Sequence, residues 1–447
     1  MRETTMNEKV LADPQRKHSA VLSSNPLQIP DQQAGADSGP LVHERWLAKR
    51  ILMFAGTPPI GIVLWDGEVI TVDSSRPPEY QMYLKDRRAL YELAINPHLS
   101  FGDLYSAGRL EVDGKLHDFF TFLFRFTEQA KPEMPLWLKA FWRDHAPRST
   151  AIEDARNNIH HHYDLGNEFY RLWLDQAEMQ YTCAYYERPD LTLEQAQLAK
   201  LEHVCRKLQL KPGQTVVEAG CGWGGLARYM AREYDVKVLA YNISTEQIRY
   251  ARAQAEAEGL SDRIDYILDD YRNINAPFDA FVSIGMLEHV GTDHYETMAR
   301  VIRDNLRPDG LALIHTIGRN RPAKMNAWIE KRIFPGAYPP SIGELMSLSE
   351  AGPFSLLDAE NLRLHYALTL EAWLDRFEAN VEHVRDMYDE HFVRAWRFYL
   401  SSSIAAFRTS GLQLFQIVLA QPENNAVPYT RRHLYQSPAA PAEENNP

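Results

Sequence analysis

The chain has 447 residues, of which 45% are hydrophobic and 11% aromatic, and a formal net charge of −12. A chain of this length is too long for one compact core, so it predicts two domains. The negative net charge disfavours nucleic acid as a partner, because phosphate binding needs clustered Lys and Arg. The three cysteines are few and unevenly spaced, as in a reducing cytosol, and no run of about 18 apolar residues predicts a membrane span.

Composition divides the chain into five segments. Both ends are polar, and residues 1–30 lack the continuous apolar core of a signal peptide, so we expect a cytoplasmic protein. The segments are a disordered tail (1–40), a small N-terminal domain of mixed helices, strands and glycine turns (41–126), a proline-containing linker (127–150), a large domain (151–421) and a second disordered tail (422–447).

Strand-like and helix-like patterns alternate through the large domain. This alternation implies βαβ units and a mostly parallel sheet, which is an α/β fold. The expected strands are one beginning at Thr215, then Val236–Tyr241, Ile264–Leu268, Ala280–Ile284, Leu311–Ile317 and Leu412–Ala420, and the expected helices include Leu193–Leu208, 245–258, 293–306 and Asp386–Phe407.

The most informative motif is the glycine-rich run Val217–Gly225 between the first of these strands and a helix. Its glycines allow a tight turn and a close approach to a ligand, and the following helix offers unpaired N–H groups. The glycine spacing also fits the dinucleotide fingerprint, so the glycines alone do not choose the cofactor. With Glu218 placed before Gly220 and Gly222, the order resembles the S-adenosylmethionine (SAM) loop of Rossmann-like methyltransferases.

Ligands of such a sheet bind at the carboxyl ends of its strands. Asn242 stands where many nucleoside binders place an acid. Ser244 and Gln247 also fit a helix capping box, which does not exclude a ligand contact by Gln247. Asp270 is expected either to bind the adenine amino group or to cap the next turn, and Tyr271 either to stack on adenine or to pack.

Three further motifs, Asn158–Tyr170, Met179–Tyr186 and Ser283–Gly291, are rich in unusual residues. Together with the glycine run and His315–Gly318, they closely resemble the cyclopropane fatty acid synthases, a group that includes the mycolic acid cyclopropane synthases. The resemblance implies a class I SAM-dependent methyltransferase and favours SAM over a dinucleotide. A weaker likeness at Phe101–Asp118 suggests the two-domain members that act on phospholipids.

The resemblance also implies a reaction, in which the SAM methyl is transferred to a cis double bond of a phospholipid acyl chain. The resulting carbocation loses a proton to bound bicarbonate and closes a cyclopropane ring. We expect Glu288 to accept a hydrogen bond from the bicarbonate hydroxyl, because two adjacent anions otherwise repel. The implied bicarbonate site is formed by Cys183, Glu288, His315, the backbone of Ile317, and Tyr366.

The implied SAM site draws on most of the loops described above. Its contacts are Tyr181, Thr182, Glu218, Gly220, Gly222, Asn242, Ile243, Gln247, Asp270, Tyr271 and Arg272, with Tyr163 as a lid residue. No metal is expected, because the adjacent residues His160–His162 would point in different directions from one helix.

The segment Gly318–Pro340 carries Arg319, Arg321, Lys324, Lys331 and Arg332 interleaved with aromatic residues. It is expected to be either a membrane-facing lid or an ordinary solvated helix. The first alternative predicts a protein peripheral to the inner face of the plasma membrane, bound to its anionic surface. A homodimer is left open.

Two other functions remain as alternatives. The first is methylation of the same double bond without ring closure, which gives a methylene- or methyl-branched acid. The second is a non-catalytic lipid-binding protein, against which the intact SAM loop argues. The proton-removing set of Cys183, Glu288, His315 and Tyr366 favours the ring.

Overall fold

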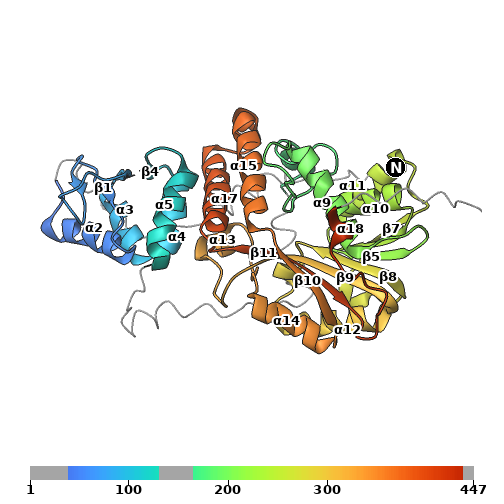
Figure 1. The fold of residues 1–447 in the computed structure, drawn as a ribbon. Coiled ribbons are helices and arrows are strands. Elements are labelled where there is room, and N and C mark those ends of the chain that lie inside the picture. The colour runs from blue at the N-terminus through green and yellow to red at the C-terminus, as the bar shows by residue number, and fades with distance from the viewer. Residues whose placement is uncertain (1–38, 130–164, 436–447) are drawn as a thin grey trace, which may run out of the picture.

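The computed structural model describes residues 39–129, called here the N-terminal part, and residues 165–435, called the C-terminal part (Figure 1). In Figure 1 the N-terminal part lies at the left in blue and teal, and the large sheet of the C-terminal part lies at the right. The helices α15 and α17 stand between them.

The N-terminal part is a four-stranded sheet in the order β2-β1-β3-β4, with β1 and β3 parallel and the outer pairs antiparallel. Asp86 and Asn96 start two of its helices by accepting the backbone N–H groups of Ala89 and Leu99. Its elements are α2 (Val42–Phe54), β1 (Ile60–Val63), β2 (Val69–Ile70), β3 (Tyr80–Leu84), α3 (Arg87–Ile95), α4 (Pro97–Ser106), β4 (Leu110–Val112) and α5 (Leu116–Gln129).

The C-terminal part is built on a seven-stranded sheet in the order β10-β11-β9-β8-β5-β6-β7. The strands from β9 to β7 are parallel, whereas β11 is antiparallel to both β9 and β10. The strands are β5 (Thr215–Ala219), β6 (Lys237–Asn242), β7 (Ile264–Leu268), β8 (Phe278–Ile284), β9 (Leu306–Gly318), β10 (Ser355–Asn361) and β11 (Gln413–Ala420).

Helices cover this sheet and extend from it. They are α8 (Asn167–Arg171), α9 (Leu193–Leu208), α10 (Gly225–Tyr234), α11 (Thr245–Ala257), α12 (Tyr295–Asn305), α13 (Ala327–Arg332), α14 (Ile342–Ala351), α15 (Arg363–Ala379), α16 (Val381–Met387), α17 (Glu390–Arg408) and α18 (Arg432–Tyr435). The helix expected over Asp386–Phe407 is divided into α16 and α17. The division arises because Asp389 accepts the N–H of Phe392 and starts a new helix.

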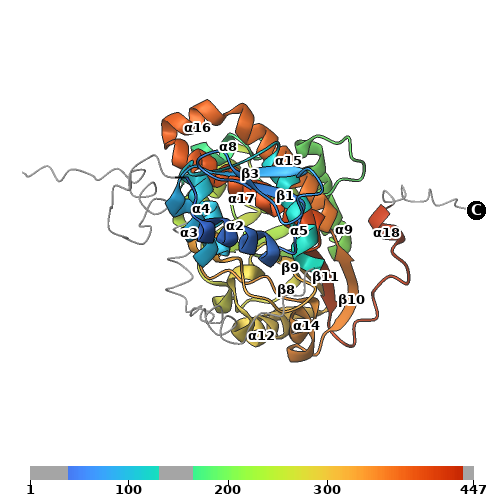
Figure 2. The same ribbon diagram turned by 90° about the vertical axis from the view of Figure 1, so that its left-hand side faces the viewer.

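The two parts share one hydrophobic core, in which α4 and α5 pack against α13 and α17. The ring of Phe398 on α17 lies 5.9 Å from Phe101 and 4.6 Å from Trp328. Asp103 on α4 accepts Trp328 Nε1–H at 3.0 Å and pairs with Arg332 at 2.9 Å. Figure 2 shows the N-terminal part in front of α17, and these contacts fix it against the C-terminal part.

The expectation of a disordered tail from residue 422 fails for the described residues 422–435. Asn424 donates to a backbone carbonyl at 3.2 Å, Arg431 pairs with Asp358 at 2.7 Å, and Leu434 is buried. The composition of this segment is polar, but its polar groups find partners on the sheet. At the other boundary, α5 continues to Gln129, past the expected start of the linker.

Within the described residues, no helix is both long enough and apolar enough to cross a bilayer. The same residues contain no group of three or more His, Cys, Asp or Glu side chains arranged to hold a metal ion. His160–His162 and Tyr163 lie outside the described residues.

Candidate active site

The glycine-rich turn after β5 leaves open space at the carboxyl edge of the sheet. Gly220 and Gly222 have φ angles of 82° and 54°, which glycine adopts without strain. A Cβ added at Gly222 would meet no protein atom within 4 Å. Glu218 is buried at the end of β5, and its Oε2 has no hydrogen-bond partner. Burial raises the pKa of this carboxyl to about 8.

Asn242, at the end of β6, braces the glycine turn. Its Nδ2 donates to the Gly222 carbonyl at 3.2 Å and to Gln247 Oε1 at 2.9 Å. Ser244 Oγ accepts the Gln247 N–H at 3.4 Å, so half of the expected capping box is present. The Gln247 side chain turns to Asn242 instead of completing it. Ile243 between them is half-buried.

After β7, the capping alternative for Asp270 is present. Its carboxylate accepts the backbone N–H of Arg272 at 2.9 Å and two guanidinium N–H groups at 2.7 and 2.9 Å. The ring of Tyr271 is buried in the core below the sheet edge, with the Arg272 guanidinium 5.4 Å from its centroid. The packing alternative for Tyr271 is therefore present as well.

The segment Tyr181–Tyr186 passes between α9 and α15. Lys200 on α9 is fully buried and donates to Thr182 Oγ1 at 2.9 Å and to Gln180 Oε1. Burial lowers the pKa of Lys200 to about 8. Lys200 therefore fixes the start of this segment from inside the protein.

Cys183 lies on the α15 side of the same segment. Its thiol is fully buried and donates to the next residue's carbonyl at 3.1 Å. Burial raises the thiol pKa, so the group is protonated at neutral pH. Thr369 and His365, one turn apart on α15, each accept a backbone N–H from the residues that follow Cys183, at 3.0 Å. Tyr366 lies on the same helix.

Glu288 and His315 lie at the ends of β8 and β9. Glu288 Oε1 accepts the Ile317 N–H at 2.5 Å, while Oε2 is buried without a partner. Burial raises the pKa of Glu288 to about 7. The side-chain amide of Gln416 forms a hydrogen bond with His315 Nδ1 at 2.9 Å. With the amide nitrogen as the donor, the imidazole proton is on Nε2. That nitrogen is buried without a partner, and burial keeps the ring neutral by lowering its pKa.

Gly285 joins these two halves of the site. It follows β8 with a φ of 68°, and its N–H donates to the His315 carbonyl at 2.9 Å. A Cβ added here would lie 3.0 Å from Thr182 Cγ2. The close approach brings the segment that carries Cys183 beside the end of β8, three residues before Glu288.

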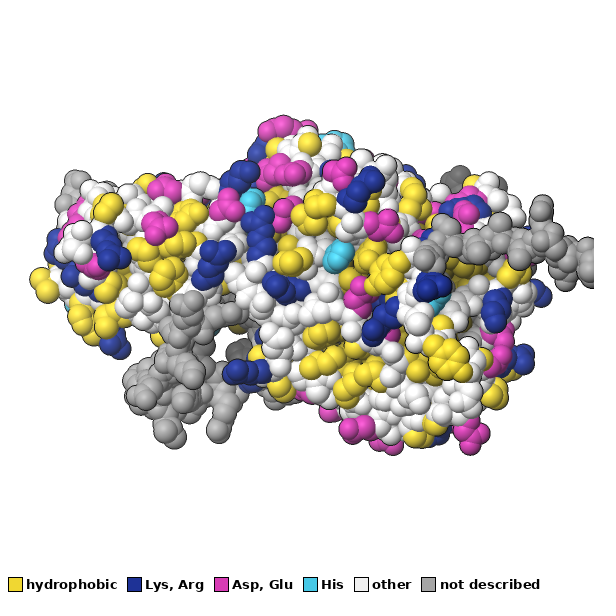
Figure 3. All heavy atoms as spheres, in the orientation of Figure 1, with side chains coloured by type: hydrophobic (Ala, Val, Ile, Leu, Met, Phe, Trp, Pro, Cys, Tyr) yellow, Lys and Arg dark blue, Asp and Glu magenta, His cyan; other side chains and the backbone are white. Residues whose placement is uncertain are grey.

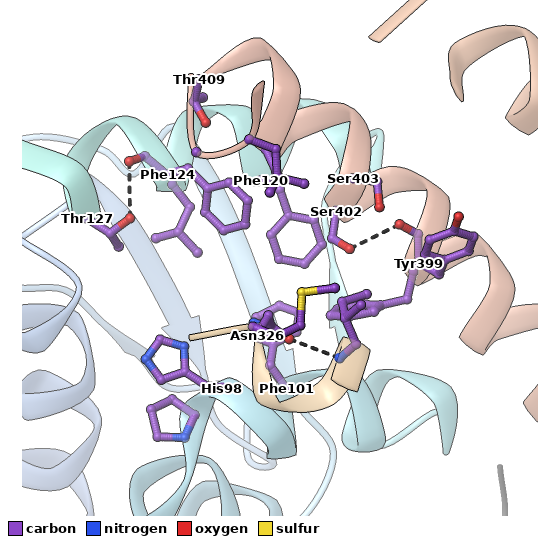
Figure 4. Close-up of a pocket in the computed structure, with 18 of the residues that line it drawn as sticks. His98, Phe101, Phe120, Phe124, Thr127, Asn326, Tyr399, Ser402, Ser403 and Thr409 are labelled. Carbon is purple, nitrogen blue, oxygen red and sulfur yellow. Dashed lines mark hydrogen bonds between the residues drawn. The ribbon is translucent and has the colours of Figure 1, made fainter. Parts of the chain in front are cut away.

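A cavity of about 870 Å³ runs from this site into the N-terminal part. Tyr181, Thr182, Glu288, Ile317 and Tyr366 line one end of it. Cys183 and His315 are buried and are not among the residues that line the cavity. In the sequence, Cys183 follows Thr182 and His315 precedes Ile317 by two residues. Figure 4 shows Phe101, Phe120 and Phe124 around the other end, and Tyr399, Ser402 and Ser403 on α17. The remainder of the wall is mostly apolar.

The charges expected on a membrane-facing lid do not all face outward. Arg332 is 8% exposed and pairs with Asp103 of the N-terminal part. Arg319 lines the cavity. Arg321 and Lys324 are exposed. The sequence could not separate these arginines, because the basic and aromatic residues that gave the amphipathic pattern also pack between the two parts.

Several residues of the site were missed from the sequence. Gln416 is a lone polar residue within the apolar strand Leu414–Leu419, which was a usable signal for a buried hydrogen bond. Lys200, His365 and Thr369 gave no such signal, because they occur in helices with polar neighbours.

A family model described as mycolic acid cyclopropane synthetase matches residues 150–417. The chain belongs to this family. A second model, described as a domain of unknown function, matches residues 47–132. The family model therefore covers the C-terminal part from its first described residue into β11.

Two curated relatives extend the comparison. The chain is 44% identical over 271 residues to the cyclopropane-fatty-acyl-phospholipid synthase of Escherichia coli, covering 60% of this chain and 69% of that protein. It is 34% identical over 392 residues to the probable fatty acid methyltransferase of Pseudomonas putida, covering 84% and 96%.

Solved structures of the family share the fold. The cyclopropane synthase MmaA2 from Mycobacterium tuberculosis has a TM-score of 0.57 at 31% identity, covering 60% of this chain and 98% of that one. The mycolic acid cyclopropane synthase CmaA1, complexed with SAH and CTAB, has a TM-score of 0.56 at 30% identity, covering 59% and 97%. The chain is a SAM-dependent methyltransferase with the predicted α/β fold and a separate N-terminal region.

Proposed function

We propose that this enzyme converts cis double bonds of phospholipid acyl chains to cyclopropane rings. The observation that carries the proposal is the cavity of about 870 Å³, apolar along most of its wall, with Glu288 and the Ile317 backbone at one end. A long acyl chain fits such a space, and a mostly apolar wall keeps water away from a carbocation.

The glycine turn after β5 and the unpaired atoms of Glu218, Glu288 and His315 suit SAM and bicarbonate. The open space at Gly222 and the unpaired Glu218 Oε2 suit a nucleoside with a charged amine. His315 Nε2–H and Glu288 Oε2, both buried without partners, suit a small oxyanion that both donates and accepts. When bound, SAM supplies the electrophilic methyl group and bicarbonate supplies the proton acceptor.

The chain's own residues then position and protect the reacting groups. An alkene is a poor nucleophile, so the segment held by Lys200 and α15 must keep the double bond in line with the methyl group. The aromatic faces of Tyr181, Tyr366 and Tyr399 stabilise a nearby cation by about 0.5–2 kcal/mol each when water is excluded. Ionised Glu288 accepts a hydrogen bond from the oxyanion, and neutral His315 donates one.

The proposal is tested with the full-length protein, SAM and vesicles of a cis-monounsaturated phospholipid. Mass spectrometry should show a gain of one methylene per double bond, and proton NMR should show the upfield protons of a cyclopropane ring. Activity should fall in bicarbonate-depleted buffer and return when bicarbonate is added. Absence of any mass gain would contradict the proposal.

A mass gain without ring protons would instead support the alternative of methylation without ring closure. The name of the Pseudomonas putida relative, a probable fatty acid methyltransferase, keeps this alternative in view. The unpaired His315 and Glu288 atoms provide a place for the base that removes a methyl proton. Loss of that proton can close the ring or give a methylene branch, so the ring protons in the NMR spectrum distinguish the two products.

The lipid must come from a membrane, and α2 offers a surface for contact with it. Val42, Trp46, Arg50 and Met53 lie on one face of the helix and are exposed, Trp46 by 60%. Trp46 and Arg50 also line the cavity. Figure 3 shows apolar, basic and acidic side chains intermixed over the N-terminal part. The exposed apolar side chains and Arg50 on one face of α2 suit the interface of an anionic bilayer, so the proposal includes peripheral binding through α2.

A further inference from the structure

Arg319 is the first residue after β9, and its backbone is fixed. Its N–H donates to the Pro340 carbonyl at 2.8 Å, and it forms an isolated bridge with Ser341. The side chain lines the cavity beside Met325 and Phe334. Arg319 is therefore a built part of the cavity wall.

No carboxylate among the described residues forms an ion pair with Arg319. Its Nη2 contacts Met325 Sδ at 3.8 Å, and its Nε is buried without a partner. The surroundings lower its pKa by burial. By contrast, the buried Arg228 pairs with Glu178 at 2.7 Å and the buried Arg332 pairs with Asp103. Arg319 itself is half-buried. A guanidinium taken partly out of water without a counter-charge is costly, so an anion from a ligand would stabilise it.

Few other charges line this space. The imidazoles of His98 and His289 have pKa values lowered by burial, to about 4 for His289, so both are neutral at pH 7. The charged groups of the described wall are then Glu288 at the reacting end, Arg50 on α2, and Arg319. An amphiphile with a long apolar chain and an anionic oxygen complements this arrangement.

We propose that Arg319 binds a phosphodiester oxygen of the lipid substrate and so sets how far the acyl chain reaches toward Glu288. This inference rests on the proposed function and adds a residue that determines specificity. Arg319 follows Ile317 by two residues, about 7 Å along a strand, and the Ile317 N–H holds Glu288. Because Ile317 lies in β9 and the backbone of Arg319, directly after the strand, is held by Pro340 and Ser341, the anchor and the reacting centre keep a fixed spacing.

The fixed spacing selects the position of the double bond. An acyl chain anchored at its phosphodiester brings only certain carbons to the reacting end, so one positional isomer of a phospholipid reacts faster than another. Removing the Arg319 guanidinium should weaken lipid binding and reduce the preference for one positional isomer, while the SAM site is left intact.

The test uses Arg319→Met, Arg319→Lys and the matched control Arg321→Met, which removes an exposed arginine of the same segment. The substrates are vesicles of two positional isomers of one cis-monounsaturated phosphatidylglycerol. Arg319→Met should raise the apparent KM at least about tenfold, as loss of a charged hydrogen bond predicts. It should also reduce the preference between isomers, with kcat changed less. Arg319→Lys should retain part of both properties, and Arg321→Met should behave as wild type.

Calorimetric titration with dodecyl phosphate shows whether Arg319 binds the phosphate of a lipid or a free anion. The wild type should bind dodecyl phosphate at least about tenfold more tightly than Arg319→Met does, and equal concentrations of inorganic phosphate should not compete. Effective competition by inorganic phosphate would overturn the proposal, since the site would then take a free anion.

Three kinetic results would also overturn the proposal. The first is an Arg319→Met variant with the KM and isomer preference of the wild type. The second is an Arg319→Met variant that needs more bicarbonate but has an unchanged KM for lipid. The third is an Arg319→Lys variant that is as defective as Arg319→Met and has a lowered unfolding temperature. If the wild type modified no vesicle lipid, the proposed function would fail, and the dodecyl phosphate comparison would still decide the role of Arg319.

Discussion

Burial sets the protonation of the residues proposed to hold the oxyanion that receives the methyl proton. The Cys183 thiol and the His315 ring are both kept uncharged, and the Glu288 carboxyl has a pKa raised to about 7. A neutral donor beside an acceptor that ionises near neutrality can hold an oxyanion without strong repulsion. These residue types were expected at the site from sequence motifs. Their protonation states depend on burial, which no motif encodes.

Replacement of Glu288 by Gln should raise stability while it lowers activity. The folded-state pKa of Glu288, about 7, lies above its ordinary value of 4.5. Its contribution to stability is therefore complete below about pH 4.5 and is lost as the pH rises through 7. Gln cannot ionise, so Glu288→Gln should gain up to about 3 kcal/mol at about pH 8, and the gain should shrink toward pH 5.

Thermal unfolding across this pH range measures the effect, and vesicle turnover should fall by at least about 100-fold. Glu296→Gln, at an exposed position on α12, should change neither property. A loss of stability at the higher pH would show that Glu288 is not held as a buried acid.

At the scale of elements, the strands were the easiest to predict, because central parallel strands give apolar runs bounded by turns. β7 has the bounds expected from the sequence, and β6 begins one residue later than expected. The polar ends of these strands were ambiguous. For Asp270 and Tyr271 the sequence fits both a structural and a ligand role, and the structure displays the structural one. Glycine positions with positive φ offer a sharper test of where SAM lies.

Gly222→Ala should impair SAM binding far more than it impairs folding. Alanine in the left-handed backbone costs about 1–2 kcal/mol, and no protein atom crowds the new methyl group. If SAM lies against this turn, its affinity should fall at least about tenfold from the lost close approach. Calorimetric titration with SAM and thermal unfolding measure the two effects.

The matched control is Gly213→Ala. Gly213 also has a positive φ, 79°, with open space around it, but it precedes β5 and so lies at the opposite edge of the sheet. It should show a similar loss of stability and an unchanged SAM affinity. Equal SAM affinities in the two variants would place the cofactor elsewhere.

At the scale of the whole molecule, the cavity belongs to neither part alone. Its reacting end lies at the sheet of the C-terminal part, and its other end is walled by α2, α4 and α5. The sequence indicated a small N-terminal region with a likeness to phospholipid-acting relatives. It could not show that Asp103 and Trp328 lock the two parts together, because contacts between distant segments leave no local pattern. This arrangement makes α2 the rim of the proposed lipid entrance.

The double variant Trp46→Glu, Met53→Glu should uncouple the enzyme from membranes. Both side chains are more than half exposed, so their replacement costs the fold little, whereas acidic groups are repelled by an anionic bilayer. Vesicle sedimentation should show at least about tenfold weaker binding, with lower turnover of vesicle lipid and unchanged SAM affinity. Leu198→Glu, at an exposed apolar position on α9, is the matched control and should bind vesicles as the wild type does.

If the wild type sediments as a dimer and the double variant as a monomer with normal vesicle binding, the α2 face is an interface between two copies of the chain. Undiminished vesicle binding without a change of oligomeric state would move the membrane contact to another surface.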